Sequence, residues 1–224
     1  MGINSRFEGL EMNLNPYSFH ICGCGAIGSS AAIQLARMGV TKFVLYDMDI
    51  VEDVNIGVSQ YDYRHIGKPK VNALSSILTD INPEIQVEVL DRYFSEYLYN
   101  GSNEVIILGF DSMKSRMDAM ETINIDCLEH HWKEPVLVID GRMGAEHYQQ
   151  YVIAAPGVFK KYTKVWYSDA DSEAEPCNLK ATSYCSNMAG SFIANAVRKF
   201  VTEQPCNYDF SFNFPIMKLS AFKT

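Results

Sequence analysis

The fold is decided by YSFHICGCGAIGSSAAIQLARMGVTKFVLYD, residues Tyr17–Asp47. It begins with an apolar run, Tyr17–Cys22, that is typical of a buried strand. After a glycine-rich turn, helical periodicity runs over Ala31–Met38, and Gly39 ends the helix. A second apolar run, Lys42–Tyr46, completes a β-α-β unit. Such a unit predicts two parallel strands joined by a right-handed crossover.

The same alternation continues up to about residue 140. Apolar runs predict three further strands, over Ile85–Leu90, Glu104–Gly109 and Pro135–Asp140. Two helices are expected between them, one over Lys70–Ile81 and one that begins at Asp111 or Ser112 and reaches about Trp132. Strands that alternate with helices predict a Rossmann-like, doubly wound α/β fold with a mostly parallel sheet.

The pattern changes in the last third of the chain, where we predict an antiparallel C-terminal extension. The expected elements are strands over Tyr148–Ala155 and Tyr162–Tyr167, a mobile acidic loop over Ser168–Asn178, a helix over Ser186–Val201 and an edge strand within Cys206–Phe222. We therefore predict one domain over 1–224. It comprises an N-terminal segment (1–16), a nucleotide-binding core (17–142) and a C-terminal part (143–224).

Composition limits the classes of function. The 224 residues carry a net charge of -8, which argues against nucleic-acid binding because such proteins are usually basic. No apolar run approaches the roughly 18 residues of a membrane span, and the first twenty residues lack an apolar signal segment. The six cysteines are too few for a disulfide scaffold. We expect a cytoplasmic protein with reduced thiols.

A glycine motif follows the first predicted strand and precedes a helix. Gly23-Cys24-Gly25-Ala26-Ile27-Gly28 reads GxGxxG, in which glycines allow a tight turn and let backbone N–H groups approach a phosphate. Asp47, at the end of the second strand, can accept hydrogen bonds from ribose hydroxyls. We expect Gly23, Gly25, Ala26, Ile27, Gly28 and Asp47 to bind a nucleotide. By themselves they also fit NAD, or a tight strand–helix junction without a ligand.

The following residues carry a more specific pattern. DMDIVEDVNIGVSQYDYRHIGKPK places Asp49 and Asn55 after Asp47 and ends at Lys70, and GFDSMKSR later places Asp111 after the fourth strand. In this order and spacing the sequence resembles the ThiF/MoeB/HesA family over residues 17–142. These enzymes adenylate the C-terminal carboxylate of a small ubiquitin-like or sulfur-carrier protein, or of a peptide, and usually form homodimers.

The resemblance implies ATP and Mg²⁺ as cofactors and assigns a role to each matched residue. Lys70 is the phosphate lysine, Asp111 is the carboxylate that holds magnesium, Asp47 holds the ribose, and Asp49 and Asn55 shape the site or contact the nucleotide. ATP and the substrate carboxylate are both anions, so the positive charges of Lys70 and magnesium suit the adenylation reaction. The alternatives are a solvated lysine at a helix start and an aspartate that only caps a helix.

Two further residues are implicated in handling the partner. In the resemblance, the region around Arg142 receives the partner's tail, so this guanidinium would suit a carboxylate; otherwise it is a loop arginine without a role. Cys177, just before the last helix, stands where relatives accept the activated carboxylate on a thiol, with Lys180 or the helix start favouring the thiolate. The alternative is an ordinary thiol.

The sequence departs from the family pattern at two places. The family's phosphate arginine falls on Val58, so Arg64 or Lys68 would have to replace it, and Arg64 is counted among the expected catalytic residues. The two CxxC pairs that hold zinc in many relatives are absent, so zinc is not expected. These departures favour one alternative, a catalytically degenerate scaffold subunit, and the glycine loop permits another, an NAD-dependent oxidoreductase. A relative's action on a tRNA base is disfavoured by the acidic charge.

Overall fold

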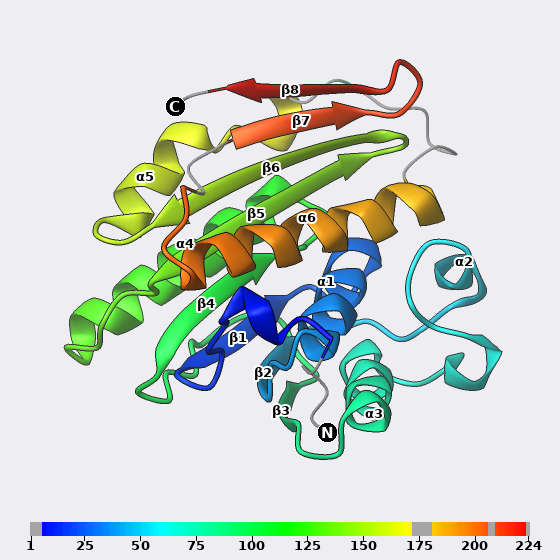
Figure 1. Cartoon of the computed structure of the whole chain (residues 1–224), viewed down its shortest axis with the longest axis horizontal. Helices are drawn as coiled ribbons and strands as arrows, with labels where there is room; N and C mark the ends of the chain where they lie inside the picture. Colours follow the sequence, from blue (N-terminus) through cyan, green and yellow to red (C-terminus); the bar gives the residue numbers. More distant parts are fainter. Residues whose placement is uncertain (1–5, 172–180, 206–208, 223–224) are drawn as a thin grey trace.

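The computed structural model describes residues 6–171, 181–205 and 209–222. One sheet runs through the whole molecule in the strand order β3-β2-β1-β4-β5-β6-β7-β8 (Figure 1). Neighbours are parallel from β3 to β5 and antiparallel from β5 to β8. The predicted doubly wound α/β sheet with an antiparallel C-terminal extension is confirmed.

The parallel part contains β1 (Tyr17–Cys22), β2 (Lys42–Tyr46), β3 (Gln86–Leu90), β4 (Asn103–Leu108) and β5 (Leu137–Gly144), with α1 (Ala26–Arg37), α2 (Asp53–Ile56), α3 (Lys70–Ile81) and α4 (Met113–Glu129) in the connections. The C-terminal part contains β6 (His147–Ala154), α5 (Val158–Val165), α6 (Ser183–Val201), β7 (Asp209–Asn213) and β8 (Lys218–Phe222). Short 3-10 turns lie at Glu8–Leu10, Tyr63–His65 and Asp169–Asp171. No helix in the described ranges is both long and apolar enough to cross a membrane.

Helices cover both faces of the sheet, so each face has its own core. One face packs against α1, α3 and α6, and the other against α4 and α5 (Figure 1). Alternation along each strand divides the side chains between these cores: Phe19 and Ile21 belong to the first, whereas Cys22 belongs to the second. The irregular segment between β3 and β4 contributes Phe94 and Tyr97 to the second core.

The structure corrects several predicted elements. Tyr162–Tyr167 is not a strand, because Val158 and Tyr162 are buried at helical spacing in α5. The tail is not one strand but the hairpin of β7 and β8, and only β8 lies at the sheet edge. Of the two N-caps expected for α4, Asp111 and Ser112, the structure has Ser112, whose hydroxyl accepts from the backbone N–H of Ser115 at 3.0 Å.

Candidate functional site

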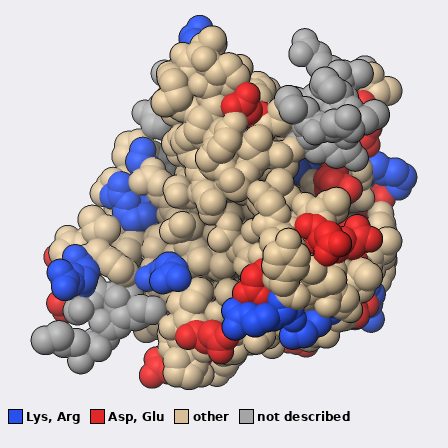
Figure 2. All heavy atoms as spheres, turned by 90° about the vertical axis from the view of Figure 1, so that its right-hand side faces the viewer, with Lys and Arg blue, Asp and Glu red and all other residues tan. Residues whose placement is uncertain are grey.

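A cavity of about 520 Å³ lies at the carboxyl ends of β1, β2 and β4. The chain leaves β1 toward β2 on one side and β4 occupies the other, which makes this the point where ligands bind in open α/β sheets. The glycine loop, the ends of β2 and β4 and the start of α3 line it. Figure 2, which views the right-hand side of Figure 1, shows charged groups of both signs around an uncharged middle.

Two glycines of the motif are required by the backbone. Gly23 has a φ of +94°, and a Cβ there would lie 2.7 Å from the backbone nitrogen of Phe110. A Cβ on Gly28 would lie 1.8 Å from the carbonyl oxygen of Gly23. Gly25 differs, because a Cβ there would meet nothing within 4 Å. The first and third glycines therefore shape the turn, and the second lies where the turn opens into the cavity.

Asp47 lines the cavity and also fixes the glycine loop. One of its carboxylate oxygens accepts from the backbone N–H of Cys24 at 2.7 Å, and the other accepts from the N–H of Asp49 at 2.8 Å. Burial raises the pKa of Asp47, although these two hydrogen bonds and the charge of Lys70 oppose the shift. The carboxylate keeps further lone pairs for a ligand, because each oxygen has accepted only one of these bonds.

Lys70, the first residue of α3, directs its ammonium to Asp49 at the cavity wall. The Nζ–Oδ2 distance is 2.7 Å, and the Lys70 side chain is 10% exposed whereas that of Asp49 is 57% exposed. Burial lowers the pKa of Lys70, but the hydrogen bond to Asp49 and the charge of Asp47 outweigh this effect and raise it. The cavity therefore holds a cation that stays protonated at neutral pH, paired with a carboxylate that water reaches.

Asp111 lies at the cavity in the loop that joins β4 to α4, and it is exposed. Within the described residues it has no hydrogen-bond or ion-pair partner. Among the described residues that line the cavity three are basic and three are acidic, so their formal charges cancel. An oxygen donor without a protein partner suits Mg²⁺, which is commonly held by one or two carboxylates together with phosphate oxygens.

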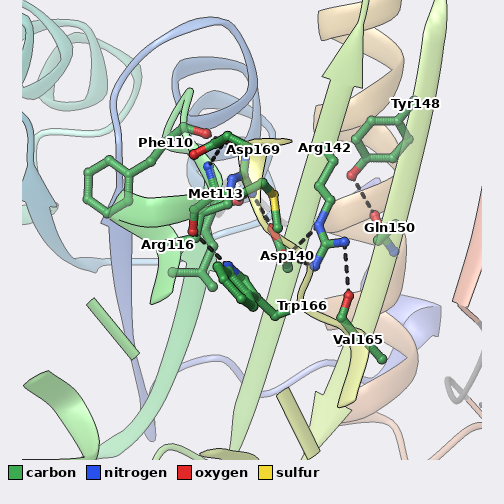
Figure 3. A network of polar contacts seen from close by, with 11 residues as sticks. Phe110, Met113, Arg116, Asp140, Arg142, Tyr148, Gln150, Val165, Trp166 and Asp169 are labelled. Atoms are coloured by element: carbon green, nitrogen blue, oxygen red, sulfur yellow. Dashed lines mark hydrogen bonds and ion pairs between the residues drawn. The ribbon is translucent and has the colours of Figure 1, made fainter. Parts of the chain in front are cut away.

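A buried cluster of three charged residues stands behind this loop (Figure 3). Asp140 is fully buried and pairs with Arg116 on one side and with Arg142 on the other, where the Arg142 Nη2–Oδ2 distance is 2.7 Å. Arg116 also donates to the carbonyl oxygens of Leu108, at 3.2 Å, and of Phe110. Arg142 is thus neither a carboxylate receptor at the surface nor a loop residue, because β5 continues past Asp140 and carries it inside.

The structure adds residues to the cavity that the sequence analysis missed. Arg92, Tyr93 and Phe94 follow β3 directly and line the cavity, as does Phe110 after β4. The Phe94 and Phe110 ring centroids lie 6.4 Å apart at 81°. Their position just beyond the carboxyl ends of parallel strands was the available signal, and aromatic faces there suit a planar base.

Other expected residues lie elsewhere. Arg64 is 83% exposed and pairs with Asp62 at 2.6 Å, and together with Lys68 it lines a second cavity of about 850 Å³. Asn55 caps α2 by accepting from the N–H of Glu52 at 2.9 Å. Neither Arg64 nor Asn55 lines the first cavity, because each is held by a near neighbour in sequence. The family's phosphate arginine falls on Val58 in this chain. In this structure neither Arg64 nor Lys68 takes its place at the first cavity.

Cys22 at the end of β1 and Cys24 in the glycine loop are poorly placed to act as nucleophiles. Cys22 and Cys24 are fully buried, and burial raises the pKa of both thiols. Both therefore pack as small apolar side chains, as buried cysteines usually do. Cys177 and Lys180 lie outside the described residues, although Ala181, four positions after Cys177 in the sequence, lines the cavity.

Comparison with known proteins identifies the family. A model of the ThiF family matches residues 7–223, nearly the whole chain. The chain belongs to the ThiF family. This membership confirms the resemblance stated from the sequence, and the match extends beyond residues 17–142 into the antiparallel part.

Two curated relatives show how this ThiF-family chain compares in sequence. It is 33% identical over 134 residues to the tRNA threonylcarbamoyladenosine dehydratase of Bacillus subtilis, covering 59% of this chain and 49% of that protein. It is 27% identical over 150 residues to the ubiquitin-like modifier-activating enzyme 5 of Caenorhabditis elegans, covering 60% of this chain and 34% of the relative. The chain thus matches half or less of the length of these relatives.

Solved structures share the fold of this ThiF-family chain. A crystal structure of E. coli MccB with ATP superposes with a TM-score of 0.71 at 18% identity, over 94% of this chain and 64% of that chain. The structure of PaaA gives the same score and identity, over 94% of this chain and 73% of that one. At this identity the likeness concerns the fold.

Proposed function

We propose that this ThiF-family chain binds ATP with magnesium and adenylates a carboxylate. The observation that carries the proposal is the convergence of four matched elements on one cavity: the glycine loop, Asp47, the Lys70–Asp49 pair and Asp111. They follow β1, β2 and β4 or lie at the start of α3, so only the fold brings them together. An NAD site would leave Lys70 and Asp111 without a role.

Each residue has a task that follows from its surroundings. The ribose hydroxyls donate to the remaining lone pairs of Asp47, and the base lies against the Phe94–Phe110 pair. Lys70 turns from the solvated Asp49 to a phosphate oxygen. Mg²⁺, held by Asp111 and phosphate oxygens, supplies the positive charge that the balanced lining of the cavity lacks.

The reaction transfers an adenylyl group. A carboxylate oxygen of the substrate attacks the α-phosphorus, the bond from that phosphorus to the bridging oxygen breaks, and pyrophosphate leaves with the electron pair. The product is an acyl-adenylate. Negative charge develops on the leaving group, and Lys70 lowers the barrier if it contacts that charge more closely in the transition state.

The carboxylate belongs, in our proposal, to the C-terminus of a small ubiquitin-like or sulfur-carrier protein or of a peptide. Relatives named ubiquitin-like modifier-activating enzyme 5 support the first class, and the fold shared with MccB, solved with the MccA peptide, is compatible with the second. Transfer of the acyl group to Cys177 and a homodimeric assembly in the cytoplasm complete the proposal.

A second substrate is favoured by one observation, the 33% identity to a tRNA threonylcarbamoyladenosine dehydratase. The threonylcarbamoyl group also carries a carboxylate, so the same adenylation would activate it. The net charge of -8 weighs against a polyanionic substrate. The two candidates therefore differ in the molecule that bears the carboxylate and not in the first chemical step.

The test is exchange of labelled pyrophosphate into ATP, after calorimetry has shown binding of ATP with Mg²⁺. Each candidate carboxylate is supplied in turn: a ubiquitin-like protein, a sulfur-carrier protein, short peptides and tRNA that bears threonylcarbamoyladenosine. We expect exchange with one protein or peptide, and its loss in Lys70→Ala and Asp111→Ala. Lys68→Ala is the matched control, because this exposed lysine lies in the other cavity.

The other outcomes separate the alternatives. Binding of ATP without exchange for any of these carboxylates would support the scaffold subunit, and thermal protection by NADH but not by ATP would support the oxidoreductase. Transfer is tested separately by trapping a conjugate that a thiol reductant releases. That conjugate should be absent in Cys177→Ala.

A further inference from the structure

We propose that residues Val165–Asp169 form a strap that positions the cavity loop Leu108–Asp111 and the start of α4, so that nucleotide binding and strap docking are coupled. The proposal rests on nucleotide binding, the first part of the proposed function, and not on the identity of the carboxylate. The strap lies outside the cavity lining and belongs to none of the family's matched motifs.

The first anchor of the strap is Met113, the first residue of α4 (Figure 3). The indole N–H of Trp166 donates to the carbonyl oxygen of Met113 at 2.8 Å. The carboxylate of Asp169 accepts from the N–H of Met113 at 2.7 Å and from that of Lys114 at 3.1 Å. Both backbone groups of Met113 therefore face the strap, two residues after Asp111.

The second anchor is Arg142. Its Nη1 donates to the carbonyl oxygen of Val165 at 3.1 Å, and its guanidinium carbon lies 4.7 Å from the centroid of the Tyr167 ring. The same guanidinium carbon lies 4.2 Å from the centroid of the Tyr151 ring. Arg142 is 6% exposed and pairs with the fully buried Asp140, so its movement into water would break a buried ion pair at a large cost.

Asp140 joins the second anchor to the cavity loop. The same buried carboxylate pairs with Arg142, which holds the strap, and with Arg116, which holds the carbonyl oxygens of Leu108 and Phe110. Both Arg116 and Phe110 line the cavity. A shift of either guanidinium weakens its ion pair with the shared carboxylate. The ordered loop and the docked strap therefore stabilise each other.

Coupling of this kind acts in both directions. A nucleotide that contacts Phe110 or Asp111 favours the ordered loop, and the ordered loop favours the docked strap. By linkage, the factor by which the nucleotide favours the docked strap equals the factor by which the docked strap favours nucleotide binding, so a variant whose strap no longer docks binds the nucleotide more weakly by up to that factor. Asp140, Trp166 and Asp169 are therefore positioning residues, since they act through Arg116, Met113 and the loop.

Trp166 provides a direct readout, because the chain has only two tryptophans. In Trp132→Phe, the remaining Trp166 should change its emission on titration with Mg²⁺-ATP, with a midpoint that matches the calorimetric Kd. Trp166→Phe is the control. Its remaining Trp132 stacks on His130 at 4.4 Å, beyond the far end of α4, and its emission should stay constant.

Helix capping provides a matched pair of variants. Asp169 accepts two N–H groups at the start of α4, and Glu134 accepts those of Gly157 and Val158, at 2.8 and 3.0 Å, at the start of α5. Asp169→Ala should weaken Mg²⁺-ATP binding at least about fivefold, the lower end of typical coupling. Glu134→Ala removes equivalent capping contacts away from the cavity, and its Kd should stay within about twofold of wild type. Asp169→Asn, which keeps one acceptor oxygen, should fall between wild type and Asp169→Ala.

The outcomes separate this proposal from the proposed function. Calorimetric binding with constant Trp166 emission, or an equal change of Kd in Asp169→Ala and Glu134→Ala, would overturn the strap alone. Absence of any calorimetric binding of ATP to the wild-type chain would overturn nucleotide binding and the strap together.

Discussion

Two sets of ion pairs border the cavity, and they differ in their access to water. In the first, Lys70 is 10% exposed and its partner Asp49 is 57% exposed. In the second, Arg116 and Arg142 are about 5% exposed and share Asp140, which is fully buried. A lysine whose partner is solvated can exchange that partner for a ligand at low cost. A carboxylate between two buried arginines has no such freedom, and it maintains the shape of the site.

The largest effect is expected from a variant that breaks the buried ion pairs of Asp140. Asp140→Asn leaves two buried guanidinium groups without a countercharge, which should lower the free energy of unfolding by about 3–5 kcal/mol. Asp49→Asn removes a carboxylate that water already solvates and should cost less than about 1 kcal/mol. Urea denaturation of the two variants measures both values. Equal losses would mean that burial does not distinguish the two sets.

The next effect tests whether Lys70 exchanges Asp49 for a phosphate of the ligand. Lys70→Met should weaken Mg²⁺-ATP binding about 10- to 150-fold, since a hydrogen bond to a charged group contributes about 1.5–3 kcal/mol. Its unfolding free energy should stay within about 1 kcal/mol of wild type, because Asp49 remains solvated. Calorimetry and urea denaturation give the two numbers, with Lys68→Met as the control. A variant that loses stability but keeps its affinity would show that Lys70 is structural.

The smallest effect is a change in stability that is expected at alkaline pH. The folded-state pKa of Lys70 is raised, so its contribution to stability is fully present below its unfolded value of about 10.5 and is lost as pH rises through the folded pKa. The difference in urea midpoint between wild type and Lys70→Met should therefore shrink above pH 10.5. The difference between wild type and Arg142→Met should persist, because the guanidinium, whose pKa Asp140 raises, stays charged there. A constant difference for Lys70 would contradict the pairing.

Local patterns predicted the parallel half of the sheet well. β1, β2 and α3 have the expected bounds, since each is a regular pattern, and β1 and α3 are also flanked by glycine or proline. The prediction of the antiparallel half was less accurate. Tyr162–Tyr167 is rich in aromatic and β-branched residues, as strands are, but the burial of Val158 and Tyr162 at helical spacing comes from packing against β6 and α4, which no local pattern contains.

The site was predictable where a residue's position follows from strand order. Asp47, Lys70 and Asp111 lie at the cavity because the carboxyl ends of parallel strands meet there. Arg64 and Asn55 lie away from the cavity, because each is held by a neighbour two or three residues away, Asp62 and Glu52. Arg142 depends on the length of β5 and on Val165, 23 residues later, and the sequence alone predicts neither.

The double engagement of Met113 has a consequence for amide hydrogen exchange. N–H groups in the first turn of a helix lack intrahelical acceptors and usually exchange rapidly with deuterated solvent. Those of Met113 and Lys114 face one carboxylate, that of Asp169, so their protection measures how often the segment lifts. The exchange rates of these two backbone protons thus report local opening of the segment in the unlabelled wild-type chain.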